Sequence, residues 1–433
     1  MGYQMWKEID PMTRPRPFDL QLTRARKTVS TAFAIGLFLL SAFVVTQCAQ
    51  AQTFTTLYTF AGGADGANPS GLLLAGGKLY GATPSGGTHE FGTVFGLSTS
   101  GKTILYSFAG SPDGQDPAGG LVRDSAGNLY GTTSEGGSPS SLGTVFKLNP
   151  ATGIETVLYS FQGNSDAFEP GAPVTLDAAG NIFGTASRGG ASGFGAVYEL
   201  DTAGVETILY SFASSSTGEY PQGGLLLDSR GNFYGTTGGG GVHNVGVVFK
   251  VDSSGVETVL HSFRGQPGDG AQPVGTLVRD SAGNGYVATS EGGAFGQGAI
   301  LSMNNKGEGS LLYSFTGGVD GGKPMAGLIL DPAGNLYGTA SVGGSSTACQ
   351  AGRVLGCGTV FELSPPLISG GVWTQTVLHT FLGTTDGGYP QTPLVRDAAG
   401  NLYGTTGVCL STCTDFGTVF EITPSGMAQS TPL

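Results

Sequence analysis

The sequence predicts an all-β protein: a seven-bladed β-propeller with four antiparallel strands in each blade. Three short phrases, LYSF, GNLYGTT and GTVF with their variants, each occur seven times in a fixed order. β-branched and aromatic residues fill these phrases, while Gly, Asn, Asp, Pro and Ser separate them, as expected of strands joined by turns. The array also begins and ends at complementary points of its repeat, which favours a closed ring over a linear solenoid.

The repeat is regular enough to define seven units. Successive LYSF copies are about 51 residues apart, except the last pair, whose extra residues fall in two loops at 347–358 and 364–375. The copies lie at 57–60, 105–108, 158–161, 209–212, 260–263, 312–315 and 378–381.

Each unit contains four predicted strands. In the second unit these are 119–124, 128–133, 143–148 and 154–161. The first two are joined by a tight hairpin in which Gly127 takes the positive φ that glycine tolerates at little cost. In a propeller the first strand lies nearest the axis, so the LYSF strand is expected at the rim.

The ends of the array predict how the ring closes. The chain opens with a lone rim strand, TTLYTF at 55–60, and ends with three inner strands at 391–397, 401–406 and 417–422. The first strand is therefore expected to complete the last blade.

Residues 1–51 are interpreted as an export signal peptide, and residues 52–433 as a single propeller. Six basic residues precede the apolar run 31–45, and Ala49 and Ala51 fit an A-x-A cleavage site. An uncut membrane anchor and a lipoprotein site at Cys48 remain as alternatives. The predicted location is secreted or periplasmic, with no membrane span in the mature chain.

Charge limits the partners. The leader holds 6 of the 19 Lys+Arg and 3 of the 31 Asp+Glu, which leaves 13 against 28 in residues 52–433, or −15. Such a body repels phosphate backbones, so nucleic acid is not expected as a partner. A cation, a neutral glycan, a peptide or a basic protein stays open.

The compound pattern LYSF…GG-DG—P-GL-LD—GNLYGTT…GG…GTVF-L resembles the GloVer tandem repeat of exported bacterial proteins. The resemblance covers residues 55–422 and implies export and a propeller-like array. It brings no activity and no catalytic residues with it. Members of this family often end in a surface-anchoring segment, whereas this chain ends in TPSGMAQSTPL.

Motifs for chemistry are scarce in the sequence. The four histidines are scattered, no nucleophile elbow or H-E-x-x-H motif occurs, and GGVDGGKP at 317–324 has Pro324 where a phosphate loop needs Ser or Thr. No catalytic residue, metal centre or cofactor is predicted.

The cysteines predict disulfides. Cys48 leaves with the leader, and the other four lie in loops of the last two units: Cys349, Cys357, Cys409 and Cys413. Pairing of 349 with 357 and of 409 with 413 is favoured, and cross-pairing stays open. These bridges are expected to staple loops, so that their loss would leave the fold intact.

Two sets of loop residues are candidates for ligand binding. The rim-to-inner loops carry a recurring aspartate that either binds calcium or, as favoured, caps its own turn: Asp65, Asp113, Asp166, Asp269, Asp320 and Asp386. The residues that differ between units are the second set: Glu135, Arg188, Glu291, Arg353 and Asp415.

The interpretation of these variable residues follows from their units. Glu135 and Arg188 lie in adjacent units and are expected to pair with each other. Glu135 and Glu291 lie three units apart, further than the roughly 5–9.5 Å that separates glycosidase carboxylates. The favoured function is therefore an exported non-catalytic module that binds a glycan, peptide or protein through its loop face. The alternative is an extracellular polysaccharide hydrolase or lyase.

Overall fold

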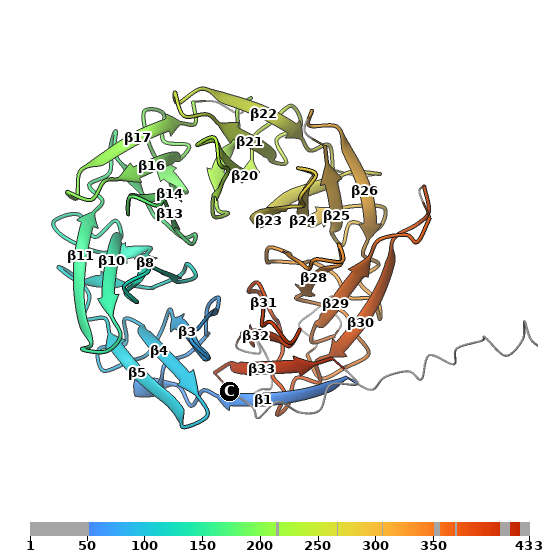
Figure 1. Ribbon diagram of the computed structural model, residues 1–433, viewed down its shortest axis with the longest axis horizontal. Coiled ribbons are helices and arrows are strands. Elements are labelled where there is room, and N and C mark those ends of the chain that lie inside the picture. Colours follow the sequence, from blue (N-terminus) through green and yellow to red (C-terminus); the bar gives the residue numbers. More distant parts are fainter. Residues whose placement is uncertain are drawn as a thin grey trace, which may run out of the picture. The chain divides into compact units, whose positions relative to one another are not determined.

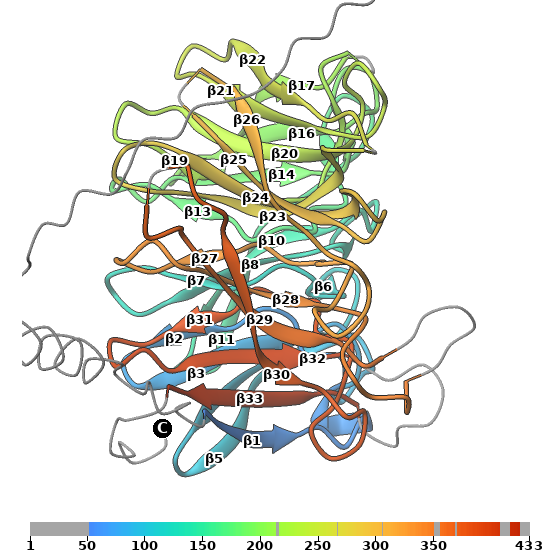
Figure 2. The ribbon, with the colours of Figure 1, turned by 90° about the vertical axis from the view of Figure 1, so that its right-hand side faces the viewer.

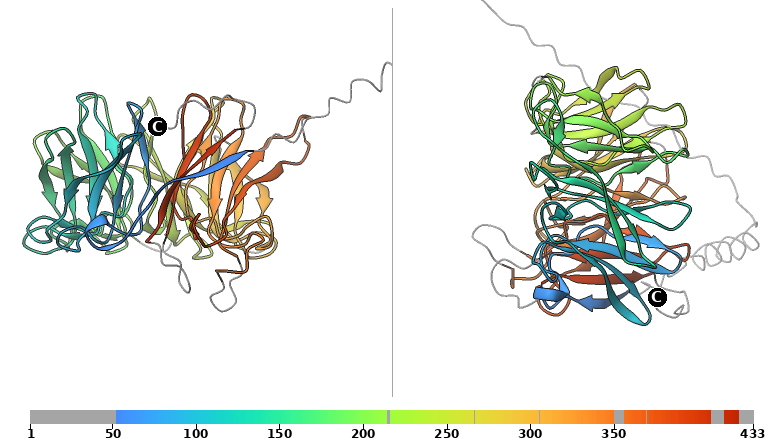
Figure 3. Two further views of the ribbon diagram at one scale, coloured as in Figure 1. Left: turned by 90° about the horizontal axis from the view of Figure 1, so that it is seen from below. Right: turned by 90° about the vertical axis from the view of Figure 1, so that its left-hand side faces the viewer.

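The computed structural model describes residues 52–213, 216–265, 267–304, 306–349, 356–368, 370–407 and 416–424. In these residues the chain forms seven four-stranded antiparallel sheets around a central axis, which confirms the predicted seven-bladed β-propeller (Figure 1). The sheets stand side by side around the ring in the side views (Figures 2 and 3). One short 3-10 turn, η2 (Gly63–Asp65), precedes blade 1.

Each blade contributes one strand to each of four layers, and the strands of each layer follow in order from blade 1 to blade 7. The innermost strands are β2 (Leu73–Ala75), β7 (Val122–Arg123), β13 (Thr175–Leu176), β19 (Leu226–Leu227), β23 (Gly270–Arg279), β27 (Ile329–Leu330) and β31 (Val395–Arg396). The second strands are β3 (Lys78–Thr83), β8 (Leu129–Thr133), β14 (Ile182–Ala186), β20 (Phe233–Gly239), β24 (Gly285–Gly292), β28 (Leu336–Ala340) and β32 (Leu402–Thr406). The third strands are β4 (Thr93–Ser98), β10 (Thr144–Asn149), β16 (Ala196–Leu200), β21 (Val247–Val251), β25 (Ala299–Met303), β29 (Thr359–Ser364) and β33 (Thr418–Thr423). The outer strands are β5 (Gly101–Ser107), β11 (Ile154–Ser160), β17 (Glu206–Ser211), β22 (Glu257–Ser262), β26 (Gly309–Ser314), β30 (Thr374–Thr380) and β1 (Thr53–Thr59).

The ring closes as the sequence predicts. Blade 7 has the strand order β31-β32-β33-β1, so the first strand of the array completes the last blade. β1 runs antiparallel to β33, from Thr53 opposite Thr423 to Thr59 opposite Thr418. Figure 3 shows β1, in blue, lying along the red blade formed by the end of the chain.

The innermost strands of blades 2 and 7 are shorter than predicted. The sequence predicts a strand over the whole of 119–124, but β7 covers only Val122 and Arg123. The reason is crowding at the axis: a Cβ atom at Gly119 would lie 2.6 Å from the carbonyl oxygen of Ala172 in the next blade. The hairpin that follows forms as expected, with Gly127 at φ +93°.

Aromatic side chains fill the space between blades. At six of the seven interfaces, the phenylalanine that ends the LYSF phrase packs edge-on against an aromatic residue in the third strand of the next blade. Phe108 and Phe146, for example, are fully buried with 5.2 Å between their ring centroids. All seven blades also contain a register shift between the third and outer strands; in blade 2, Leu158 is the extra residue. Such a bulge bends the strand.

One outer-strand position varies between blades. Lys102 forms an ion pair with Asp65 at 2.7 Å, and its side chain is almost fully buried. Gln375 donates its side-chain amide to the carbonyl oxygen of Asp320 at 3.1 Å. Blades 2, 3 and 4 instead place a glutamate here: Glu155, Glu206 and Glu257.

These three glutamates lie in an environment that disfavours their charge. Burial and the neighbouring Asp113 raise the pKa of Glu155 to about 7. Burial and Asp166 raise the pKa of Glu206 to about 7, and burial raises the pKa of Glu257 to about 7. One carboxylate oxygen of each glutamate is buried and has no hydrogen-bond partner in the described part of the chain.

We expect removal of the closing strand to open the ring. Deletion of residues 53–60 leaves the whole edge of β33 unpaired, and an unpaired edge is a template for aggregation. The deletion variant should melt many degrees below the parent and elute as aggregates in size-exclusion chromatography. Substitution of the exposed Thr53 by Ala is the control and should change neither measurement. Equal melting temperatures for the parent and the deletion would contradict ring closure by β1.

The raised pKa values of the three outer-strand glutamates predict that the stability of the fold falls as pH rises. A glutamate with a raised pKa in the folded state holds its proton more tightly there than in the unfolded chain, where the pKa is about 4.5. The stabilisation that comes from this difference in pKa is fully present below pH 4.5 and is lost as the pH rises from about 4.5 to 7. Glu155→Gln should therefore raise the melting temperature by a few degrees at pH 8 and change it little at pH 4.5. The exposed Glu135→Gln is the control, and an equal effect of Glu155→Gln at both pH values would refute this explanation.

Candidate ligand-binding face

Two loops from each blade emerge on the same face of the ring, which we call the loop face. They are the loop that leads into the innermost strand and the loop between the second and third strands. In blades 2 and 3 these loops pair as two-residue ladders, β6 (Gly114–Gln115) with β9 (Glu135–Gly136), and β12 (Ala167–Phe168) with β15 (Arg188–Gly189). In blade 4, β18 (Glu219–Pro221) pairs with β20. These ladders hold the two loops of each of these blades together.

The recurring loop aspartates hold their own loops together. Asp113 accepts hydrogen bonds from the Tyr106 hydroxyl at 3.0 Å and from the backbone N–H of Ala109 at 2.9 Å. The same pair of bonds recurs at the other five aspartates, with His261 and His379 replacing the tyrosine at Asp269 and Asp386. The turn-capping interpretation is therefore confirmed for these residues. In the described part of the chain no three His, Cys, Asp or Glu side chains come together as a metal site.

A further loop position is shared by all seven blades, immediately before the loop proline. At this position a residue other than glycine has a φ between +49° and +58° in every blade. Such values are uncommon for side-chain-bearing residues. These residues, which we call the mouth ring, are Asn68, Asp116, Glu169, Tyr220, Gln272, Lys323 and Tyr389.

The backbone of the mouth ring is fixed by the preceding blade. Each N–H donates to the carbonyl oxygen of the residue before the GTVF glycine of that blade, at 2.7–3.1 Å, as Glu169 does to Leu142. The following proline packs on that glycine, where a Cβ atom would lie only 2.5–2.7 Å from the proline ring. The seven residues therefore have equivalent backbone positions, whatever their side chains.

The mouth ring borders the central channel. In six of the seven blades the residue two positions after it lines the channel: Ser70, Ala118, Gly171, Gln222, Met325 and Gln391. Asn68, Tyr220 and Gln272 are exposed, whereas Asp116, Glu169 and Lys323 are partly buried and Tyr389 is buried. Six of the seven side chains thus reach the surface around the channel mouth.

A pocket of about 760 Å³ opens beside the channel across blades 2 to 4. Its lining includes Glu135, the mouth-ring residue Glu169, Ser134, Ser187 and Gln222. Glu169 forms a 2.9 Å ion pair with Arg188, and Glu135 accepts a hydrogen bond from the Gln115 amide at 2.5 Å. The pocket therefore presents several donors and acceptors already fixed in position by neighbouring side chains.

The predicted site residues have different outcomes. The expected pairing of Glu135 with Arg188 is wrong, because Glu169, which directly follows the strand paired with that of Arg188, binds the guanidinium instead. Glu291 lies at the equivalent place in blade 5, opposite Ala271, and is not part of this pocket. Arg353, Asp415, Cys409 and Cys413 lie outside the described residues.

Sequence reasoning missed the mouth ring and Glu169. The signal was present, since all seven loops contain a proline and the residue before it differs in every unit except for the two tyrosines. Spacing could not reveal the positive φ or the position at the channel, because both arise from contact with the preceding blade.

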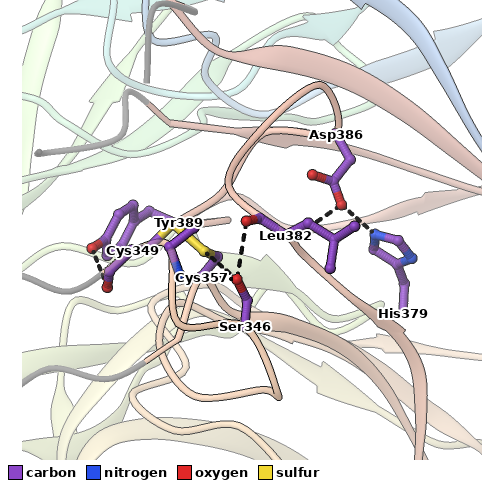
Figure 4. Close-up of a disulfide and its surroundings, with 8 residues drawn as sticks. Ser346, Cys349, Cys357, His379, Leu382, Asp386 and Tyr389 are labelled. Carbon is purple, nitrogen blue, oxygen red and sulfur yellow. Dashed lines mark hydrogen bonds and ion pairs between the residues drawn. A yellow bond between two sulfur atoms is a disulfide. The ribbon is translucent and has the colours of Figure 1, made fainter. Parts of the chain in front are cut away.

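The predicted disulfide between Cys349 and Cys357 is confirmed. Both cysteines are fully buried and belong to a core cluster with Phe381, Tyr389 and Leu394. The Tyr389 hydroxyl donates to the carbonyl oxygen of Cys349 at 3.1 Å (Figure 4). The bridge therefore packs blade 6 against blade 7 and does more than staple a loop.

Removal of this bridge should destabilise the protein. The double substitution of Cys349 and Cys357 by Ser places two hydroxyls in an apolar cluster, and loss of a native disulfide typically costs about 2–5 kcal/mol. A drop of several degrees in melting temperature is expected, while thiol titration of the unfolded parent should find no free thiol at these two positions. An unchanged melting temperature would support the simpler loop-staple role.

Solved structures of other proteins were compared with this chain. The extracellular domain of a one-component system from B. thetaiotaomicron superposes with a TM-score of 0.52 at 9% identity, over 85% of this chain and 40% of that chain, so this chain spans less than half of that relative. A gluconolactonase from Xanthomonas campestris superposes with a TM-score of 0.43 at 13% identity, over 86% and 90% of the two chains. Curated protein sequences give no match. No helix among the described residues is long and apolar enough to span a membrane.

The repeat itself has a family match. The Gloeobacter/Verrucomicrobia repeat matches residues 43–178 and 143–351, which together cover more than half of the chain. This is the GloVer family whose phrases the sequence resembles. The chain belongs to the Gloeobacter/Verrucomicrobia repeat family.

Proposed function

We propose that this protein is an exported, non-catalytic propeller that binds a glycan at the channel mouth of its loop face. The observation that carries the proposal is the mouth ring: seven equivalent backbone positions with six different residue types. Positive φ is strained for these residues, and such strain clusters at ligand-binding positions. Glycine would relieve it at every position, yet none of the seven is glycine.

The chemistry of the ring and pocket suits a sugar. Amide, carboxylate, hydroxyl and ammonium groups lie around the mouth, and sugar hydroxyls both donate and accept hydrogen bonds. Tyr220 adds an aromatic side chain that is 39% exposed, a surface for the C–H face of a sugar ring. Pockets of a few hundred Å³ with a few fixed polar groups are typical of small-ligand sites.

A binding role is favoured over hydrolysis because the pocket carboxylates already have partners. Glu169 is paired with Arg188, and Glu135 with Gln115. A general acid or base must reach the scissile bond, whereas the Glu169 carboxylate is engaged by the Arg188 guanidinium. Export rests on the leader-like segment 1–51 and on the family's exported members.

Replacement of mouth-ring residues by glycine separates ligand binding from folding. Glycine relieves positive φ, so Tyr220→Gly and Gln272→Gly should keep or raise the melting temperature. If these side chains contact a glycan, the same variants should bind it at least about tenfold more weakly, a loss of about 1.4 kcal/mol. Binding is measured by a glycan array on the parent, followed by calorimetry on the hits. Lys306→Ala, at a turn between β25 and β26, is the matched surface control.

Three outcomes would overturn parts of this proposal. A parent that binds peptides but no glycan would reassign the ligand class. A glycan whose affinity is unchanged in both glycine variants would place the site elsewhere. Release of shortened oligosaccharides from a polymer by the purified protein would replace the binding role with the hydrolase or lyase alternative.

A further inference from the structure

Blade 5 departs from the repeat at its second strand. The other six blades place a large apolar residue at the first core position of this strand: Leu79, Leu129, Ile182, Phe233, Leu336 and Leu402. All six are buried. Blade 5 has Gly285 instead, so a buried side chain is missing from the interface with blade 4.

One neighbouring side chain refills part of this space, and one exchanged pair does not affect it. Two positions later, Val287 replaces the usual glycine and lies opposite Leu301, which replaces the usual aromatic residue. The larger side chain at 287 therefore only makes up for the smaller one at 301. Leu277 occupies part of the vacated position, since a Cβ atom at Gly285 would lie only 3.1 Å from its closest methyl group, closer than an ordinary van der Waals contact. The space that remains lies toward the face of the ring opposite the loop face.

A cleft of about 780 Å³ lies at this place, between blades 4 and 5. Its lining includes Leu226, Leu260, Leu277 and Met303, with Gly285 among them. Leu277 and Met303 are core residues, so apolar side chains form the deep part of the cleft. A cleft of this size accommodates a small organic molecule.

Basic side chains gather at the rim of this cleft. Arg230, Lys250 and Arg279 line it, three of the 13 Lys+Arg in residues 52–433 of a chain that is otherwise acidic. The Arg279 guanidinium lies over the Tyr234 ring at 4.6 Å from its centroid and donates to the carbonyl oxygen of Gly283. Arg279 is thereby held in one orientation at the cleft.

The two carboxylates in the lining are engaged in their own turns. Asp228 accepts three hydrogen bonds from Asn232 and Tyr234, at 2.9–3.1 Å. Asp280 accepts the equivalent three from Asn284 and the Tyr286 hydroxyl, at 2.8–3.0 Å. Both carboxylates stay charged, so the lining holds three cations against two carboxylates, and this excess of positive charge favours an anionic ligand.

We propose that this cleft is a second binding site, separate from the mouth ring, for a small organic anion with an apolar body, such as an aryl or alkyl carboxylate or sulfonate. The apolar part packs on Leu260, Leu277 and Met303, and the anionic group lies between Lys250 and Arg279. Burial of the apolar part removes it from water, and the rim cations attract the charged head.

The test compares two probes that share an aromatic body. Anilinonaphthalene sulfonate is anionic, and N-phenylnaphthylamine is its uncharged relative. Fluorescence titration of the full chain should give one saturable site with at least about tenfold higher affinity for the anionic probe. Gly285→Leu restores the leucine that blades 1, 2, 6 and 7 hold at this position. Leu277 must shift to admit the new side chain, which fills the cleft, so this variant should lose the binding of both probes.

Matched lysines distinguish a built site from general surface binding. Lys250 and Lys147 occupy the same strand position in blades 4 and 2. Lys250→Ala should weaken anionic-probe binding at least about fivefold while leaving the neutral probe unchanged, whereas Lys147→Ala should change neither. Tyr220→Gly should leave both affinities at the parent value, which separates this site from the mouth ring.

The proposal fails on any of three results. The parent shows no saturable binding of the anionic probe, Gly285→Leu folds with a cooperative melt and still binds it, or Lys147→Ala weakens binding as much as Lys250→Ala. If Gly285→Leu does not fold, the two lysine variants decide, because both lysines are partly exposed and neither belongs to the buried core.

Discussion

Each blade is held against the next by a proline ring, which packs on a glycine of the preceding blade where any side chain would clash. In all seven junctions the proline packs on the GTVF glycine of the preceding blade, and the residue before the proline donates its N–H to the same segment. The seventh junction joins Gly417 to Pro69 across the two ends of the array. The seven equivalent junctions hold neighbouring blades in the same way around the ring, which is the regular spacing that lets β1 reach β33.

This constraint explains why the backbone of the loop face is uniform while its side chains differ. The junction uses the N–H of the mouth-ring residue and the ring of the following proline, but it leaves the mouth-ring side chain outside the contact. Asn68, Glu169, Tyr220 and Lys323 can therefore differ without a change in blade geometry. In the binding role proposed above, these residues gain from preorganisation, since the backbone is already fixed and little ordering remains to oppose binding. The positive φ at each mouth-ring position is a source of backbone strain that comes with this junction.

Departures from the repeat have local consequences because the blades are nearly independent of one another except at their shared interfaces. Gly285 changes one interface while the ladder between β24 and β25 stays regular, and the Cys349–Cys357 bridge fills another interface. The outer-strand position of Lys102 is another local departure, because other blades place a glutamate there without a change of fold. Lys102 forms an ion pair with its loop aspartate, whereas Glu155 and Glu206 face a carboxylate, and burial favours their neutral form. Function in such a ring is expected at positions where one interface or one loop differs from its six counterparts.

The sequence by itself determined the number of blades, the order of strands within each blade and the closure of the ring. These features follow from the period of the repeat and from local turns such as the Asp124–Asn128 hairpin. Both depend only on residues that are close together in the sequence. It also identified the cysteine pair at 349 and 357, whose short separation leaves few geometric options. Only the tertiary structure decided that Arg188 pairs with Glu169, that the residue before each proline borders the channel, and that Gly285 opens a cleft. Each of these depends on distances between residues of different loops or blades, and hydrophobic period and spacing carry no information on such distances.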